Sequence, residues 1–138
     1  MTLLYIKSYT RAYINTHPDW LFVFGDNLAR TGLGGQAAEA RGEPNAIGIA
    51  TKMLPTMEPS AFLADSNYDA WFAAERPTFN RLYEAAKAGQ TIIWPLDGIG
   101  TGLARLEQKA PLIWREIDNV RAWLDGMPVA ETVRRVKP

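Results

Sequence analysis

Short apolar runs and segments with helical periodicity alternate along the chain. Four runs predict β-strands: residues 3–6, 20–24, 46–50 and 91–94. The run at 20–24 is apolar at every position, which is typical of a strand buried on both faces in a parallel or mixed sheet, and it stops at Gly25. The run at 91–94 has a similar character and ends at Pro95. The pattern therefore predicts two buried strands, each followed directly by a glycine-rich segment.

Four further segments have the periodicity or composition of helices. The predicted helices are a brief one capped by Ser8 and ended before Pro18, residues 37–41 ended by Gly42, a helix opened by residues 76–78 and closed by Gly89, and a helix from Pro111 to Gly126. The last is the clearest, because its apolar positions follow the 3.6-residue period of one helix face: Ile113, Ile117, Val120 and Leu124. Residues 53–66 contain two prolines and no clear period, so they predict a surface excursion.

This alternation of strands and helices predicts the fold class. Connections long enough for crossovers imply a three-layer α/β/α arrangement, and a length of 138 residues fits one domain, residues 1–138. In such sheets ligands bind outside the carboxyl ends of the strands. Both glycine-rich segments are expected at that edge.

Composition narrows the classes of function. The chain has 15 basic and 15 acidic side chains, so we expect no membrane partner and no strong binding of unmodified nucleic acid. It has no cysteine and one histidine, so a metal centre is not expected, and neither is a catalytic thiol. No leader-like or membrane-spanning apolar stretch is present, which predicts a cytoplasmic protein.

Two glycine-rich loops carry the candidate chemistry. Residues 25–36 follow the first buried strand, and residues 96–102 follow the second. Glycines allow positive φ angles and close approach of backbone N–H groups, as a phosphate-binding nest requires. The alternative is that they only make tight turns between strand and helix. Neither loop matches the P-loop or the G-x-G-x-x-G signature, which disfavours kinases and dehydrogenases.

Five segments together resemble the macrodomains, in particular the branch of DNA and protein ADP-ribosylglycohydrolases that use a lysine. The segments that carry the resemblance are residues 24–27 (Phe-Gly-Asp-Asn), 32–37 (Gly-Leu-Gly-Gly-Gln-Ala), 49–52 (Ile-Ala-Thr-Lys), 76–79 (Arg-Pro-Thr-Phe) and 95–106, the second loop. The resemblance implies a macrodomain-like three-layer sandwich with a mixed central sheet. It implies ADP-ribose or an ADP-ribosylated macromolecule as partner, and no cofactor.

The resemblance also implies roles for individual residues. Lys52 matches the lysine that does the chemistry in that branch, and as a free amine it can attack the anomeric carbon of an ADP-ribosyl adduct. One departure is that the branch places a catalytic aspartate directly after Gly-Leu in the second loop, where this chain has Ala104. Asp97 and Asp26 are the nearest carboxyl groups. The alternatives for Lys52 are a solvated strand end and a clamp for the diphosphate.

The expected site therefore has a catalytic and a binding part. The expected catalytic residues are Lys52 and Asp97, and the expected ligand-binding residues are Asp26, Asn27, Gly34, Gly35, Gln36, Gly98, Ile99, Gly100, Thr101, Gly102 and Leu103. Asp26 or Asn27 would bind the adenine amino group or the distal ribose; both are also ordinary turn and cap residues. The predicted function is binding of ADP-ribose or a related NAD-derived nucleotide, with removal of ADP-ribose from modified DNA or protein as the activity. The alternatives are a non-catalytic binding module and a structural protein that kept the fold.

Overall fold

A computed structural model describes residues 2–126, and its elements follow the expected alternation of strands and helices. In chain order they are β1 (Thr2–Ile6), α1 (Arg11–Thr16), β2 (Leu21–Asn27), α2 (Ala37–Ala40), β3 (Ala46–Lys52), two 3₁₀ turns (Pro59–Ala61 and Asp65–Asn67), α3 (Tyr68–Lys87), β4 (Thr91–Pro95), α4 (Leu106–Lys109) and α5 (Pro111–Leu124). The four strands lie where the apolar runs predict them. The α/β class is thereby confirmed.

The sheet has the strand order β1-β4-β2-β3, and all its pairings are parallel. The expected mixed sheet is therefore wrong for the described residues. The physical reason is that each connection between strands passes through a helix, which returns the chain to the starting edge of the sheet. The antiparallel pairing that the structure records is an isolated bridge between Lys52 and Phe62, outside the ladder.

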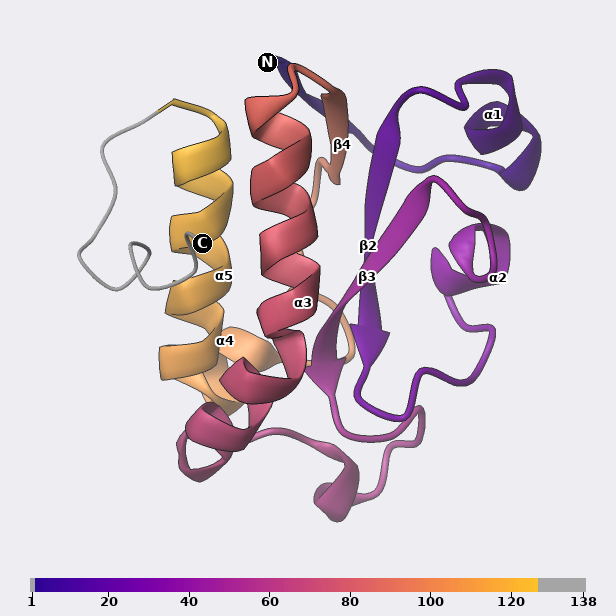
Figure 1. The fold of residues 1–138 in the computed structure, drawn as a ribbon. Coiled ribbons are helices and arrows are strands. Elements are labelled where there is room, and N and C mark those ends of the chain that lie inside the picture. Colours follow the sequence, from indigo (N-terminus) through magenta and orange to yellow (C-terminus); the bar gives the residue numbers. More distant parts are fainter. Residues whose placement is uncertain (1, 127–138) are drawn as a thin grey trace.

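Helices cover both faces of the sheet (Figure 1). The long helices α3 and α5 pack on one face, where the main core includes Val23, Ile92 and Trp94. The short helices α1 and α2 cover the other face over a smaller core that includes Phe22 and Phe24. Alternate residues of β2 thus contribute to the two cores, as the prediction of a strand buried on both faces requires.

The start of α1, the end of β2 and the presence of α4 differ from the sequence pattern. The cap of α1 is Thr10, whose side chain accepts from the Tyr13 N–H, and Ser8 lies outside the helix. Strand β2 continues through Gly25 to Asn27 because Gly25 and Asp26 still pair with β3. The chain also forms the short helix α4, which the pattern did not predict.

Helix α3 begins at Tyr68, and Pro77 lies inside it. The expectation that residues 76–78 open this helix is therefore wrong. A proline in a helix interior removes one backbone hydrogen bond, so the sequence alone favours a start there. Burial of Trp71 and Phe72, both on the turns before Pro77, stabilises the longer helix.

Candidate functional site

The carboxyl half of β2 separates from β4. The two strands pair only through Leu21 with Ile92 and Phe22 with Ile93, whereas β2 stays paired with β3 to its end. Gly25 is consequently exposed, although it lies in a central strand of the sheet. A Cβ at Gly25 would have a single heavy atom within 4 Å, the Thr51 Cγ2 atom at 3.9 Å. The sheet is therefore uncovered at this point, and we call the uncovered edge between the carboxyl ends of β2 and β4 the crevice.

Pro95 and Tyr9 explain why the two strands part. Continuing their register would bring the Val23 carbonyl opposite the Pro95 nitrogen, which has no hydrogen to donate. The Tyr9 hydroxyl donates to the Val23 carbonyl instead. Tyr9 is 3% exposed, and burial raises the pKa of its phenol, which keeps the hydroxyl a donor. The opening of the sheet is thus built into the fold.

The crevice lies at the topological switch point of the sheet. After β2 the chain passes to α2 on one face, and after β4 it passes to α4 and α5 on the other. Ligands of open α/β sheets bind where neighbouring strands connect to opposite faces in this way. Residues 28–36 and 96–105 form the loops on the two sides. Among the described residues, no hydrogen bond or ion pair joins these two loops.

Both loops contain residues with left-handed backbone conformation. In the first loop these are Gly32, Gly35 and Arg30, and in the second Gly98, Gly100 and Arg105. Arg30 and Arg105 are the two residues other than glycine with positive φ in the described part of the chain, at 56° and 47°. Such conformations cost energy and concentrate at functional sites. One occurs on each side of the crevice.

The first loop is held at residues 31–32, whereas its glycines at 34 and 35 have open space around them. Arg41 donates from Nε to the Gly32 carbonyl (2.8 Å) and from Nη2 to the Thr31 carbonyl (3.1 Å). By contrast, a Cβ at Gly34 or Gly35 would meet no atom within 4 Å. The backbone of these two expected binding residues is accessible.

Asp26 is enclosed by arginines. Its carboxylate lies 2.6 Å from Arg41 Nη2 and 3.5 Å from Arg30 Nη1, and the residue is 7% exposed. Gly48 makes room for it, because a Cβ there would lie 2.6 Å from Asp26 Oδ2. The structure thus places Asp26 within an internal ion-pair network, with its carboxylate already occupied.

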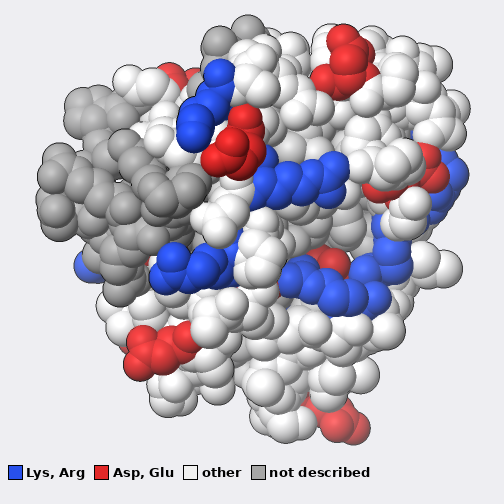
Figure 2. Space-filling view, viewed as in Figure 1, with Lys and Arg blue, Asp and Glu red and all other residues white. Residues whose placement is uncertain are grey.

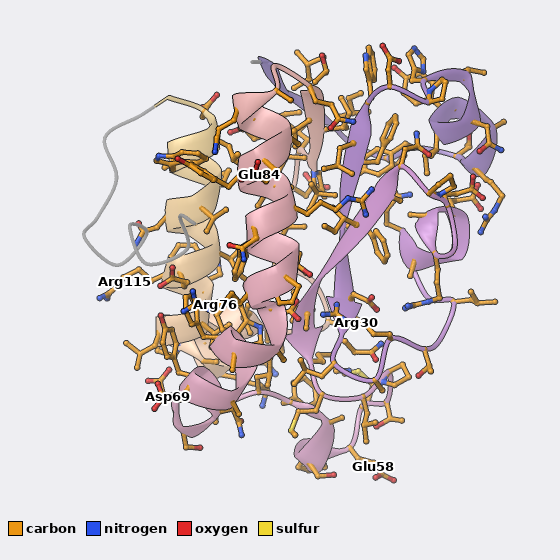
Figure 3. The ribbon with its side chains drawn as sticks, viewed as in Figure 1. Arg30, Glu58, Asp69, Arg76, Glu84 and Arg115 are labelled. Atoms are coloured by element: carbon orange, nitrogen blue, oxygen red, sulfur yellow. The ribbon has the colours of Figure 1, made fainter. Side chains whose placement is uncertain are left out.

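Arg30 extends this network to α3 (Figure 3). It pairs with Glu75 and donates to the Gly48 carbonyl at 3.1 Å. Glu75 is fully buried, accepts from the Ala50 N–H, and has its pKa raised by burial. These contacts satisfy backbone groups on the outer edge of β3, which otherwise could pair with another strand.

Two other expected binding residues also have internal partners. Gln36 accepts from the Tyr9 N–H at 3.0 Å and donates to the Tyr9 carbonyl at 2.6 Å. Asn27 donates from Nδ2 to the Thr31 carbonyl at 2.8 Å, and its own N–H donates to Asp26 Oδ1. Their side chains therefore fix the ends of the first loop, and its backbone at residues 34–35 is what remains available to a ligand.

The second loop combines one constrained glycine with an open tip. A Cβ at Gly100 would lie 2.8 Å from Leu106 Cδ2, and its φ is +78°, so only glycine fits. Thr101 donates to the Asp97 carbonyl at 2.7 Å, which closes the turn. Ile99 is buried in the main core. Gly102 has open space around it, and Leu103 is 74% exposed.

Lys52 lies at the end of β3, but its amine is turned into its own loop. The ammonium donates to the Thr56 carbonyl and lies 4.6 Å from the centre of the Phe62 ring. Lys109 of α4 lies 4.5 Å from the centre of the same ring. Desolvation lowers the pKa of Lys52. Among the described residues no contact joins Lys52 to Asp97, which is exposed in the second loop.

Figure 2 shows basic side chains across the middle of the face that α5, α3 and β3 form. In the same view, Figure 3 places Arg115 on α5, Arg76 on α3 and Arg30 in the loop that follows β2. Arg30 is paired with Glu75, and Arg76 lies over the Phe72 ring at 5.2 Å, so two of the three have partners within the fold. Within residues 2–126, no group of three His, Asp or Glu side chains could hold a metal ion.

Sequence reasoning did not identify the residues that shape the crevice. These are Tyr9, Arg30, Arg41, Glu75 and Gly48. The signals that could have found two of them are a glycine within a strand pattern, at Gly48, and an acidic residue on the apolar face of a helix, at Glu75. The decisive contacts of the other three residues join segments 14 to 45 residues apart, so no local pattern reveals them.

The comparisons with known proteins place the chain in a family. In the described part of the chain, no helix is long and apolar enough to cross a membrane. No curated protein and no solved structure matches the sequence. One family model matches residues 4–120, a span that includes both glycine loops, and the chain therefore belongs to a family of unknown function (DUF7831).

Proposed function

We propose that the chain binds ADP-ribose or a closely related NAD-derived nucleotide in the crevice between β2 and β4. Backbone N–H groups of the two glycine loops would hold the diphosphate. The observation that carries this proposal is the pair of strained loops on either side of exposed Gly25, at the switch point of a parallel sheet. The macrodomain-like order of sequence segments selects ADP-ribose among nucleotides.

Charge in the second loop supports an anionic ligand. Arg105 is the N-cap residue before α4, is exposed, and forms no ion pair within residues 2–126. Its positive φ of 47° holds it at the end of the loop. By contrast, Arg30 on the other side is neutralised by Asp26 and Glu75. Arg105 is therefore the cation that we expect to contact the diphosphate.

The test is titration of the whole chain with ADP-ribose by calorimetry. Gly102→Val adds a side chain where no atom lies within 4 Å and where φ is not positive, so the fold should persist while the crevice is blocked. We expect ADP-ribose to bind at least about tenfold more weakly, which is about 1.4 kcal/mol. Ala74→Val on the exposed side of α3 is the control. Unchanged binding by folded Gly102→Val, or no binding by the wild type, contradicts the proposal.

A second candidate function is removal of ADP-ribose from modified DNA or protein, favoured by the lowered pKa of Lys52. The amine would form a bond to the anomeric carbon as the bond to the macromolecule breaks, and an acid would protonate the departing atom. Asp97 is exposed and its carboxylate has no partner within residues 2–126, whereas Asp26 is enclosed by arginines. The chemistry requires that the Lys52 amine leave the Thr56 carbonyl.

Measuring the release of ADP-ribose from modified DNA and protein separates the enzyme from the binding module and the structural protein. Lys52→Ala should abolish release yet leave ADP-ribose binding within a few-fold, because the amine acts in the transition state. Lys109→Ala, which removes the other lysine at the Phe62 ring, is the matched control. Borohydride should trap a reduced sugar adduct on Lys52. Binding without release identifies a non-catalytic binding module, and neither binding nor release identifies a structural protein.

A further inference from the structure

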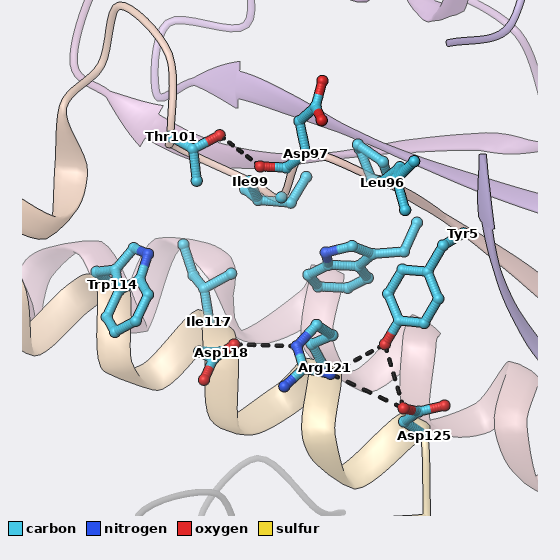
Figure 4. A pocket seen from close by; sticks show the side chains of 13 residues that line it. Tyr5, Leu96, Asp97, Ile99, Thr101, Trp114, Ile117, Asp118, Arg121 and Asp125 are labelled. Carbon is cyan, nitrogen blue, oxygen red and sulfur yellow. Dashed lines mark hydrogen bonds and ion pairs between the residues drawn. The ribbon is translucent and has the colours of Figure 1, made fainter. Parts of the chain in front are cut away.

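A separate pocket lies between the β1–β4 side of the sheet and α5 (Figure 4). Its volume is about 470 Å³, within the range of sites that hold small molecules. The loop after β4 forms one wall, and α5 forms the opposite wall. No residue of β2 or of the first glycine loop lines it, whereas Asp97, Gly98, Ile99 and Thr101 of the second loop do, so the pocket shares only that loop with the crevice.

The interior of the pocket is mainly apolar and aromatic. Trp94 and Ile99 line it from the sheet side, and Trp114 and Ile117 line it from α5. Figure 4 shows Trp114 and Ile117 on the helix facing Ile99 and Thr101 across the open space. Flat aromatic walls of this kind favour an aromatic ligand, which can stack or make edge contacts with them.

One polar group inside the pocket lacks a partner. Trp94 is 1% exposed, yet its indole N–H makes no hydrogen bond within residues 2–126. Trp71, which is also fully buried, donates from the equivalent Nε1 atom to the Ala50 carbonyl at 2.8 Å. Because Trp94 lines the pocket and its Nε1 atom is not fully enclosed, the N–H can donate to an acceptor on a ligand held there.

Charges at one end of the pocket limit the ligand further. Arg121 donates to Asp118 at 3.0 Å and to the Tyr5 hydroxyl at 2.9 Å, and the Tyr5 hydroxyl donates to Asp125 at 3.3 Å. This end therefore has two carboxylates and one guanidinium, joined in a network (Figure 4). The excess negative charge disfavours an anionic ligand.

We propose that this pocket binds a small, uncharged aromatic molecule whose carbonyl oxygen or ring nitrogen accepts a hydrogen bond from Trp94 Nε1. The aromatic walls contact the ring of the ligand, the Trp94 N–H fixes its orientation, and the network at Arg121 excludes acids. The pocket shares the second glycine loop with the crevice, but this proposal does not rest on the proposed function, because its ligand is uncharged and its test uses no nucleotide.

Three probes of the same ring size test the proposal on the whole chain. Benzamide is uncharged and has an acceptor, benzoate is anionic, and toluene has no acceptor. The chain has five tryptophans, so a ¹H–¹⁵N spectrum resolves at most five indole N–H signals, and Trp94→Phe identifies one of them. We expect benzamide to shift the Trp94 signal downfield in a saturable way. Toluene should shift it little, and benzoate should not bind.

The variant gives a second readout. Trp94→Phe keeps an aromatic ring but removes the N–H, so benzamide should bind about fivefold more weakly while toluene binding is unchanged. Trp20→Phe, which alters a ring stacked on His17 outside the pocket, is the control. Equal shifts from benzamide and toluene, or unchanged benzamide affinity in Trp94→Phe, overturn the proposal. If Trp94→Phe does not fold, the wild-type titrations test the proposal alone. The proposal is overturned if no indole signal is shifted by benzamide and left unshifted by toluene.

Discussion

Arg41 Nη2 lies 2.6 Å from Asp26 Oδ1, so the carboxylate at the end of β2 is bound by the residue that follows α2. Arg41 also holds the Thr31 and Gly32 carbonyls of the first loop. One arginine therefore neutralises the buried aspartate and sets the position of the loop. Asp26, which the sequence resemblance places in the binding site, thus helps to hold the structure around the crevice.

Arg41→Met should destabilise the fold by about 2 kcal/mol, because the buried Asp26 carboxylate keeps only the longer ion pair to Arg30 and the Asn27 N–H. Urea unfolding of the variant and wild type measures this difference. Arg115→Met is the control: Arg115 is exposed and forms no ion pair among the described residues, so its loss should cost less than about 0.5 kcal/mol. Equal stability of Arg41→Met and Arg115→Met would show that the Asp26 pair contributes nothing.

Tyr9→Phe should cost about 1.5 kcal/mol, because the Val23 carbonyl loses the donor that replaces the missing Pro95 N–H. Thermal unfolding monitored by circular dichroism provides the comparison. Tyr13→Phe serves as the matched control, since Tyr13 is 37% exposed and its hydroxyl makes no hydrogen bond within residues 2–126. If Tyr9→Phe leaves the stability unchanged, the Val23 carbonyl must find another hydrogen-bond donor.

Gly100→Ala should destabilise the fold by about 2 kcal/mol. The cost combines a φ of +78° with a Cβ placed 2.8 Å from the buried Leu106 side chain. Gly102→Ala, two residues later, meets neither obstacle and should change stability by less than about 0.5 kcal/mol. Denaturant midpoints of the two variants measure the difference in stability. An equal loss of stability at both positions would show that the loop is not held as described.

Glu116 should give the stability of the protein a pH dependence. Burial raises its pKa from 4.5 to about 7, and Tyr68 donates to it at 2.7 Å. Between these two values the native state binds more protons than the unfolded state. The stabilisation from the protonated form is therefore complete below about pH 4.5 and is lost as the pH rises through about 7.

Glu116→Gln removes this titration. Relative to the wild type, the variant should gain stability on the order of 2 kcal/mol between pH 4.5 and pH 8, as measured by urea unfolding across that range. Glu107→Gln on the exposed side of α4 should run parallel to the wild type. A Glu116→Gln profile that is also parallel to the wild type would place the pKa of Glu116 near its ordinary value.

Local patterns in the sequence determined where most elements and both glycine loops lie. The apolar runs of β2 and β4 are visible in sequence because these strands are buried between helical layers, and all four predicted strands form. The stripe from Ile113 to Leu124 is buried as its period predicts. Gly126 has the positive φ of 78° that a glycine after a helix end commonly adopts.

The tertiary structure alone decided the direction of the strands, the start of α3 and the state of the expected site residues. Pro77 is tolerated within α3 because burial of Trp71 and Phe72 outweighs one lost backbone bond. Asp26, Gln36 and Lys52 have partners that lie between 4 and 27 residues away. The crevice exists because β4 meets β2 at a proline, and the pocket at Trp94 exists because α5 packs beside the same strand. Contacts between distant segments depend on the packing of the whole chain, so no local spacing of residues encodes them.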